Sequence, residues 1–413
     1  MRNLKILVQK FGGTSVADPD RRAQAAAKII AAKDAGFSPV VVVSAIGRNG
    51  DPYATDTFLN LVKGINHDIP RRELDILMSC GEVISGSVMV TSLLALGYEA
   101  VLLTGAQAGI ITTNTFGDAR IIRIEPKNIL ANLAQDKIVV VAGFQGVTED
   151  GDITTLGRGG SDTTASALGV ALNAEAIEIY TDVEGIMTAD PRLVENARIL
   201  DVVTYNEIVQ LAYQGAKVIH PRAVEIAAQR NIPLWVKSTF SDASGTLVTN
   251  QVDSDTMEAH TDITSDRLIT GIAHTPNVSQ LWLNVDPAKH TPEFNLKIFA
   301  AMALADISVD FITILPTAVV YTVKDEVAGK AVKILANMGF EAVVKASCAK
   351  IAVIGGGIAE VTGVMAQVIE ALTNENIQVL QSADSNATIW VLVAKDNMVQ
   401  AVRALHASFR LDR

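Results

Sequence analysis

Short runs of β-branched and apolar residues alternate with helical patterns from the start of the chain to Val248. This alternation predicts an α/β unit with a largely parallel sheet. Each run ends in a polar or glycine-containing loop, and because ligands of open α/β sheets lie beyond the carboxyl ends of the strands, we expect these loops to share one rim. The six predicted strands are Ile6–Val8, Val40–Val43, Ala100–Leu103, Ile138–Ala142, Ala176–Tyr180 and Leu234–Val236.

A long helical pattern runs from Arg71 to Leu96 and carries two stripes. The stripe predicted to face the core consists of Leu74, Leu77, Met78, Gly81, Ile84 and Val88. A neighbouring stripe consists of Asp75, Ser79, Glu82 and Gly86. Its glutamate could reach a substrate ammonium group, although a solvated glutamate on an amphipathic helix is the commoner case.

The second half of the chain contains a tandem repeat with an offset of 70 residues. The matching pairs are Leu281–Val285 with Ile351–Gly355, Ile307–Phe311 with Ile377–Gln381, and Ala318–Val323 with Thr388–Val393. Each copy reads strand, helix, strand, strand, helix, which is consistent with a βαββαβ ferredoxin-like unit. We therefore predict a domain over residues 1–248, a polar linker over 249–266, and two repeats over 267–346 and 347–413.

The composition is that of a globular protein with more than one domain. The chain has 413 residues, 49% of them hydrophobic, and its net charge of -11 argues against a nucleic-acid or polyanionic membrane partner. No uninterrupted apolar run reaches the length of a membrane span, and the N-terminus lacks the features of a signal peptide. Cys80 and Cys348 lie far apart without a CxxC pair, so we expect buried, reduced thiols in a cytoplasmic protein.

The stretch Thr154–Leu172, TTLGRGGSDTTASALGVAL, is the strongest candidate for chemistry. Its glycines let the backbone approach a ligand, and Ser161 and Asp162 could cap the helix that follows. Arg158 adds a guanidinium, a forked cation, next to the helix N-terminus. The guanidinium and the helix N-terminus together predict an anion site. The alternative is an ordinary strand-to-helix turn with a good cap.

Other loops add charge and hydroxyl groups. Lys10–Val16 has a lysine before two glycines but is not a Walker loop, and the hydroxyls of Arg48–Asp56 could bind a carboxylate or cover the site. Thr181–Asp182, Met187–Arg192 and Gly215–Pro221 could bind nucleotide phosphates and ribose. The last three segments could instead be surface turns or helix ends, and the Lys10 loop could be a tight strand-helix turn with a surface lysine.

Taken together, these stretches resemble aspartokinases, which have the amino-acid-kinase fold followed by ACT domains. The motifs that carry the resemblance, in order, are KFGGTSV, the Gly81-Glu82 pair, GFQG, TTLGRGGSDTTA, TDVEGIMTADPR and GAKVIHPRAV. The segments GDPYATD and QSADS look most like the diaminopimelate-sensitive type.

The resemblance implies a role for individual residues. Lys10 would contact the transferring phosphate, Arg158 would hold a carboxylate of aspartate, and Asp162 would organise the lysine and help place magnesium-bound phosphates. The substrate-side positions are Ser44, Thr55, Glu82, Phe144, Arg158 and Ser161, with Glu82 as the partner of the amino group. The nucleotide-side positions are Lys10, Phe11, Gly12, Gly13, Thr181, Asp182, Met187, Arg192, Lys217 and Val218. Met187 stands where some relatives have a tyrosine, and Mg²⁺ would be bound mainly through the ATP phosphates.

The resemblance also implies the reaction and its control. ATP would phosphorylate the side-chain carboxylate of L-aspartate, giving 4-phospho-L-aspartate and ADP at the start of the lysine, threonine and methionine pathway. The ACT repeats would bind diaminopimelate or lysine, with threonine as a further candidate. They would also join copies of the chain, or join it to a separately translated regulatory chain that begins near Met257. Two alternatives are a kinase of the same fold that acts on another small acid, and a non-catalytic amino-acid sensor.

Overall fold

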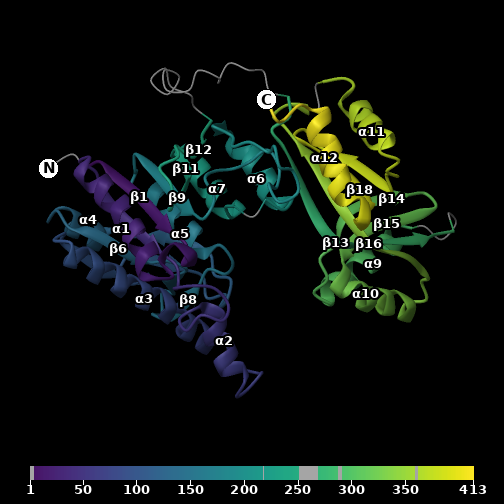
Figure 1. Cartoon of the computed structure of the whole chain (residues 1–413). Coiled ribbons are helices and arrows are strands. Elements are labelled where there is room, and N and C mark those ends of the chain that lie inside the picture. Colours follow the sequence, from purple (N-terminus) through teal and green to yellow (C-terminus); the bar gives the residue numbers. More distant parts are fainter. Residues whose placement is uncertain (1–3, 217, 251–267, 287–290, 359–360) are drawn as a thin grey trace. The chain divides into compact units, whose positions relative to one another are not determined.

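The computed structural model describes residues 4–216, 218–250, 268–286, 291–358 and 361–413. The chain divides into two compact units (Figure 1). The first unit comprises Met1–Ile186, Ile199–Ala212 and Lys217–Ser265, and the second comprises Met187–Arg198, Tyr213–Ala216 and Asp266–Arg413. Met257 and most of the predicted linker lie outside the described residues.

An eight-stranded sheet forms the centre of the first unit, with the strand order β10-β12-β11-β9-β1-β2-β6-β3. The six predicted runs are its six parallel strands, so the predicted α/β fold class is confirmed. These strands are β1 (Ile6–Phe11), β2 (Ser38–Val43), β3 (Ala100–Leu103), β6 (Ile138–Ala142), β9 (Ala176–Thr181) and β11 (Leu234–Ser238). The added strands β10 (Val202–Val203) and β12 (Thr246–Val248) run antiparallel to them.

Helices cover both faces of this sheet. On one face, α1 (Pro19–Asp34) and α3 (Arg71–Ala95) share a core cluster with Phe11 and with Val41 and Val43. On the opposite face, α5 (Gly160–Ala171) packs so closely on β9 that a Cβ at Gly169 would lie 2.5 Å from Ile177. The remaining helices of this unit are η1 (Gly13–Val16), α2 (Thr55–Lys63), α4 (Lys127–Leu133), α6 (Tyr205–Tyr213) and α7 (Pro221–Ala228).

The orientation of α3 differs from the prediction. Its most buried residues include the polar stripe Asp75, Ser79, Glu82 and Gly86, whereas most of the predicted core stripe is only half-buried. Small residues explain this, because a Cβ at Gly86 would lie 2.4 Å from Leu102. By length and composition α3 could cross a membrane, but the carboxylates on its buried face fit a core helix of the first unit.

A second, four-stranded sheet lies against α3, and its last strand in the sequence leads into α5. Its strand order is β5-β4-β7-β8, formed by β5 (Ile121–Ile124), β4 (Ile110–Thr112), β7 (Gln145–Val147) and β8 (Ile153–Thr155). Only the four residues Leu156–Gly159 separate β8 from α5. This sheet therefore sets where the glycine-rich turn begins.

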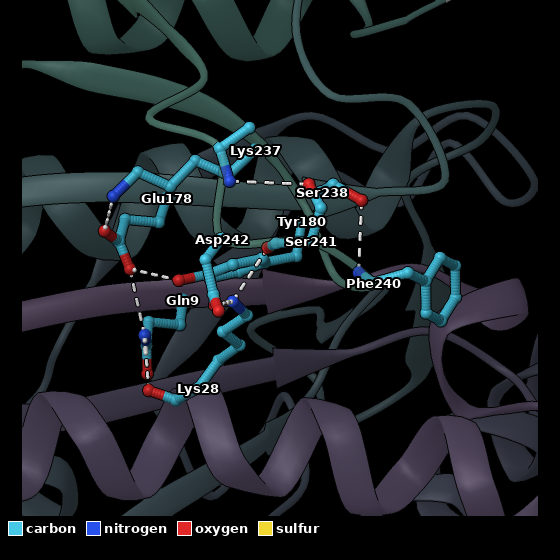
Figure 2. A network of polar contacts seen from close by, with 10 residues as sticks. Gln9, Lys28, Glu178, Tyr180, Lys237, Ser238, Phe240, Ser241 and Asp242 are labelled. Carbon is cyan, nitrogen blue, oxygen red and sulfur yellow. Dashed lines mark hydrogen bonds and ion pairs between the residues drawn. The ribbon is translucent and has the colours of Figure 1, made fainter.

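A buried polar network joins β1, β9 and β11 on the face covered by α1 (Figure 2). The carboxylate of Glu178 accepts hydrogen bonds from Gln9 Nε2 at 2.9 Å, Tyr180 OH at 3.0 Å and Lys237 Nζ at 2.6 Å. Next to it, the Tyr180 ring stacks on Phe11 with centroids 4.8 Å apart. Three donors thus compensate for the burial of one carboxylate.

The second unit contains one six-stranded sheet, in the order β14-β15-β13-β16-β18-β17. Its strands are β13 (Gly271–Asn284), β14 (Asp310–Leu315), β15 (Ala318–Lys324), β16 (Ala342–Ile354), β17 (Gln381–Asp384) and β18 (Thr388–Ala394). Its helices are α9 (Pro292–Leu304), α10 (Asp325–Asn337), α11 (Val364–Asn374), η3 (Lys395–Asn397) and α12 (Met398–Ser408).

The two ferredoxin-like repeats of this unit share their long strands. The first repeat runs from the second half of β13 to the first half of β16, and the second repeat starts with the other half of β16. The described residues after α12, 409–413, form no strand. The second half of β16 instead pairs with the first half of β13, Gly271–Pro276, which therefore completes the second repeat. Register shifts after Pro276 bend β13 where it passes from one repeat to the other.

The cysteine prediction is half wrong. Cys348 is buried, as expected, but Cys80 is exposed on α3, and both are free thiols. The reason is the rotation of α3, which turns the Asp75 stripe inward and Cys80 outward.

Candidate active site

The carboxyl ends of the parallel strands border a cavity of about 420 Å³. Its lining contains all six predicted substrate-side residues: Ser44, Thr55, Glu82, Phe144, Arg158 and Ser161. Lys10, Gly13 and Asp162 line it as well. Loops from β1, β2 and β6, helix α3 and the glycine-rich turn therefore converge on one site.

Lys10 and Asp162 form an ion pair in this cavity. Lys10 Nζ lies 2.7 Å from Asp162 Oδ1, and the two side chains are only 13% and 12% exposed. The lysine comes from the end of β1 and the aspartate from the first turn of α5, on the same face of the sheet. The pair holds the ammonium group at a fixed place and leaves it accessible from the cavity.

The turn before α5 brings backbone groups to the cavity. Gly157 and Gly159 adopt left-handed backbone with φ of 73° and 68°, which favours glycine. The predicted caps are wrong: the N-cap residue is Gly159, and Ser161 and Asp162 lie inside the first helical turn. No side chain caps this helix, and the N–H group of Gly160 donates to Gly157 O. The next N–H groups, of Ser161 and Asp162, belong to residues that line the cavity and are the donors for an anion.

Arg158 lies in this turn with an exposed side chain that has no hydrogen bond or ion pair to any described residue. Behind it, the ring of His220 packs on Gly159, where a Cβ would lie 2.2 Å from His220 Cγ. Burial lowers the pKa of His220. The Arg158 guanidinium is therefore available to a ligand, and the His220 ring packed on Gly159 supports the turn that carries it.

Glu82 is the buried acid of the cavity. It is 3% exposed, its Oε1 accepts a hydrogen bond from Ala45 N at 3.1 Å, and its Oε2 has no partner among the described residues. Burial raises the pKa of Glu82 to about 8. An unpaired buried carboxylate that lines a cavity is a binding point for a cation.

The loop after β1 approaches the backbone of the β2 loop. A Cβ at Gly13 would lie 2.5 Å from Gly47 O and 2.6 Å from Ala45 O, so only glycine fits there. Gly12 precedes η1, and its nearest neighbour for a Cβ is Lys10 Nζ at 3.4 Å. Phe11 is fully buried, which leaves only its backbone for contact with a nucleotide.

The other nucleotide-side residues do not line the cavity. Thr181 ends β9, and Asp182 pairs at 2.7 Å with Arg48, which does line it. Met187 and Arg192 belong to the second unit, where the Arg192 side chain is 85% exposed and pairs with Asp190. Val218 is half-buried, and Lys217 lies outside the described residues.

Asp75 belongs to the predicted polar stripe of α3, but no role was predicted for it. Asp75 is fully buried on α3 and binds the end of β8. The sequence contained a reason to consider Asp75, because it stands two helical turns before Glu82 on the same stripe. Among the described residues, no group of three or more His, Cys, Asp or Glu side chains could hold a metal ion.

Comparisons with known proteins define the class. Residues 5–238 match the model of the amino acid kinase family, and residues 343–407 match that of an ACT domain. The sheet, the lysine loop and the uncapped helix N-terminus thus belong to an amino acid kinase with a C-terminal ACT region.

The relatives narrow this class further. The chain is 52% identical to aspartokinase 1 of Bacillus subtilis (strain 168), over 99% of this chain and all of that protein, and 39% identical to an aspartokinase of Mycolicibacterium smegmatis, over 99% and 97%. A crystal structure of E. coli aspartokinase III in complex with aspartate and ADP has a TM-score of 0.77 and 27% identity, over 98% of this chain and 99% of that one. The chain belongs to the aspartokinase family, as the motifs predicted.

Proposed function

We propose that this chain transfers the γ-phosphoryl group of ATP to the side-chain carboxylate of L-aspartate, giving 4-phospho-L-aspartate and ADP. The observation that carries the proposal is that the unpaired Glu82 carboxylate shares one cavity with Arg158 and the Lys10–Asp162 pair. An amino acid with two carboxylates offers a partner to each of these groups. The aspartate and ADP bound to E. coli aspartokinase III support this assignment.

On the acceptor side, Glu82 binds the ammonium group and Arg158 binds one carboxylate as a forked donor. Ser44, Thr55 and Ser161 supply hydroxyls along the same wall, and Phe144 supplies an apolar contact and its backbone. These contacts orient the free carboxylate towards Lys10.

The chemical step needs alignment rather than a base. The side-chain carboxylate of aspartate is ionised near neutral pH and can attack phosphorus directly. Lys10 stabilises the charge on the transferring phosphoryl group, Asp162 holds that ammonium in place, and the N-terminus of α5 adds donors. Mg²⁺ bound through the ATP phosphates would neutralise further charge, and the Lys10 ammonium, which lines the cavity, fits such a phosphate group.

On the nucleotide side, we assign Phe11, Gly12 and Gly13 through their backbone, together with Thr181, Asp182 and Val218. Met187, Arg192 and Lys217 complete the assignment, with Met187 as an apolar contact for the adenosine. The support for these residues is their match to the family motifs and, for the Gly12 and Thr181 loops, their place at the ends of the adjacent strands β1 and β9.

A second cavity, of about 350 Å³, lies in the ACT region between the start of α11 and β17. It is lined by Ser382, Asp384 and Ser385 of the QSADS segment and by apolar residues such as Val364. We propose that diaminopimelate or lysine binds here with an ammonium group at Asp384 and inhibits the enzyme; threonine is a further candidate. E. coli aspartokinase III has been crystallised in complex with lysine and aspartate, which supports an amino-acid effector.

We also propose the domain bounds 1–248, 249–266, 267–346 and 347–413, and a cytoplasmic location with no membrane or nucleic-acid partner.

Copies of the chain would assemble through the ACT region, or this region would bind a separately translated regulatory chain. Exposed apolar side chains of this unit, such as Leu304, Leu296 and Val343, support an interface.

The test is a coupled ADP-release assay with aspartate, glutamate, carbamate and UMP as acceptors. Turnover with aspartate that stops when EDTA removes Mg²⁺ is the expected result. Turnover with another acceptor would assign a different kinase, and no turnover would favour the amino-acid sensor. Addition of diaminopimelate, lysine or threonine to the same assay tests the regulation, and unchanged rates with all three would contradict it.

A further inference from the structure

Asp75 is a fully buried carboxylate that lies outside the cavity. Its Oδ2 accepts hydrogen bonds from Thr155 N at 2.7 Å and Gly117 N at 2.9 Å, and its Oδ1 accepts one from Thr155 Oγ1 at 2.8 Å. Two of the three partners are backbone N–H groups that can only donate, and both bond Oδ2, whereas the Thr155 hydroxyl could turn and accept a hydrogen bond. An amide at this position would therefore keep its oxygen for the two N–H groups but lose the charge that strengthens these bonds.

These partners stand on both sides of the turn that carries Arg158. Thr155 is the last residue of β8, three residues before Arg158. Gly117 lies against Gly157 across the turn, where a Cβ would be 3.2 Å from Gly117 O and 2.8 Å from Asp118 Oδ1. One side chain of α3 therefore holds the start of the turn and the loop on which the turn rests.

The same helix carries Glu82, seven residues after Asp75. Seven residues are nearly two turns and rise about 10 Å, so both carboxylates project from one side of a rigid element. Glu82 binds directly in the cavity, whereas Asp75 acts through the turn at Arg158. The separation between the ammonium-binding and carboxylate-binding groups is thus set by one helix.

We propose that Asp75 is a positioning residue that fixes Arg158 relative to Glu82, so that α3 selects an α-amino acid with the length of aspartate. The inference rests on the proposed binding of aspartate by Arg158 and Glu82. Loss of the Asp75 contacts would let the turn move, while the Lys10 loop on the main sheet would stay in place. We therefore expect the loss of these contacts to weaken the binding of aspartate and to leave the binding of ATP unchanged.

The experiment compares Asp75→Asn with the wild-type chain in the ADP-release assay. We expect the KM for aspartate to rise about 10- to 100-fold, because a displacement of about 1 Å is enough for such losses. The KM for ATP should stay within about twofold. The preference for aspartate over glutamate, as the ratio of kcat/KM values, should fall. Ser79→Ala is the matched control, because Ser79 is buried one turn further along α3 and its hydroxyl bonds only Ile76 O.

Thr155 provides a second, milder test in case Asp75→Asn does not fold. Thr155→Val removes one donor and keeps both backbone donors, so a smaller rise in the KM for aspartate is expected, and Thr155→Ser should restore the wild-type value. An unchanged KM for aspartate in a folded variant, or an equal rise for aspartate and ATP, would overturn the positioning role. A wild-type chain that does not phosphorylate aspartate would instead refute the proposed function, and this inference with it.

Discussion

Aspartate binding should become stronger as the pH rises from about 6.5 to 8.5, and Glu82 should be the cause. Burial raises the pKa of Glu82 to about 8, so this carboxyl is mostly protonated at neutral pH in the free protein. Only the ionised form attracts an ammonium group, so binding must release the proton. His220 also lies near Arg158, and burial lowers its pKa from the ordinary value of a histidine.

The size of the effect follows from the pKa. If aspartate binds only ionised Glu82, the apparent Kd equals the intrinsic Kd multiplied by one plus ten to the power of pKa minus pH. With a pKa of about 8, this factor is about 33 at pH 6.5 and about 1.3 at pH 8.5, a gain of about 25-fold. The folded state also holds this proton more tightly than the unfolded chain, so the contribution of Glu82 to stability falls as the pH rises from about 4.5 to 8.

Isothermal titration calorimetry of aspartate in two buffers with different ionisation enthalpies measures both the affinity and the protons released. At pH 7 we expect about 0.9 proton released per aspartate bound, since that fraction of Glu82 is protonated. Glu82→Gln keeps the shape of the side chain and cannot titrate, so it should bind weakly and without a pH slope in this range. A flat affinity in the wild-type chain, or the same slope in Glu82→Gln, would refute the reasoning.

Three further substitutions test the site and its support. Lys10→Ala should lower kcat far more than it raises the KM for aspartate, and near-normal turnover would remove Lys10 from the mechanism. Gly159→Ala should lower both the melting temperature and the activity, because its methyl group would meet His220 in left-handed backbone; an unchanged melting temperature would contradict this packing. Tyr180→Phe should lower the free energy of unfolding in urea by about 1 kcal/mol and leave both KM values unchanged, since it removes the hydrogen bond to Glu178 and keeps the ring stacked on Phe11; a larger loss, or none, would be inconsistent with that network.

The hydrophobic pattern was sufficient for the parallel strands. Runs such as Val40–Val43 are buried on both faces, and nothing in the sequence competes with a central strand there. The loops after these strands were predicted to share one rim, and three of them line the cavity, at Gly13, Ser44 and Phe144. The loops after β3, β9 and β11 do not line it. Topology made the prediction possible, because parallel strands bring their carboxyl ends to one edge.

The buried face of α3 could not be predicted in the same way. Periodicity ranks faces by hydrophobicity, and by that measure Leu74 and Leu77 belong inside. The structure instead buries the face with Asp75 and Gly86. The missing side chain of Gly86 allows the helix to approach Leu102 closely, and donors from β8 satisfy the carboxylate of Asp75. Both reasons depend on segments far away in the sequence.

The ACT region shows a similar limit. The offset of 70 residues identified two copies of one unit, but it did not reveal that Gly271–Pro276 completes the second copy. A repeat in the sequence compares segments with each other and carries no information on which strand pairs with which. Only the pairing of β13 with β16 shows that the two repeats form one sheet and that neither is complete without the other.

The position of Lys10 illustrates how a site at a strand end depends on both faces of its sheet. Successive side chains of β1 point in opposite directions, so Lys10 meets Asp162 on one face while Gln9 and Phe11 point to the other. There, Gln9 bonds Glu178 of the neighbouring strand β9 (Figure 2). Phe11 stacks on Tyr180 of the same strand. The residues that anchor the lysine are therefore its immediate neighbours in sequence, on the side away from the substrate. Since β9 leads directly into Thr181, the same contacts hold the lysine loop and the proposed nucleotide loop in a fixed relation.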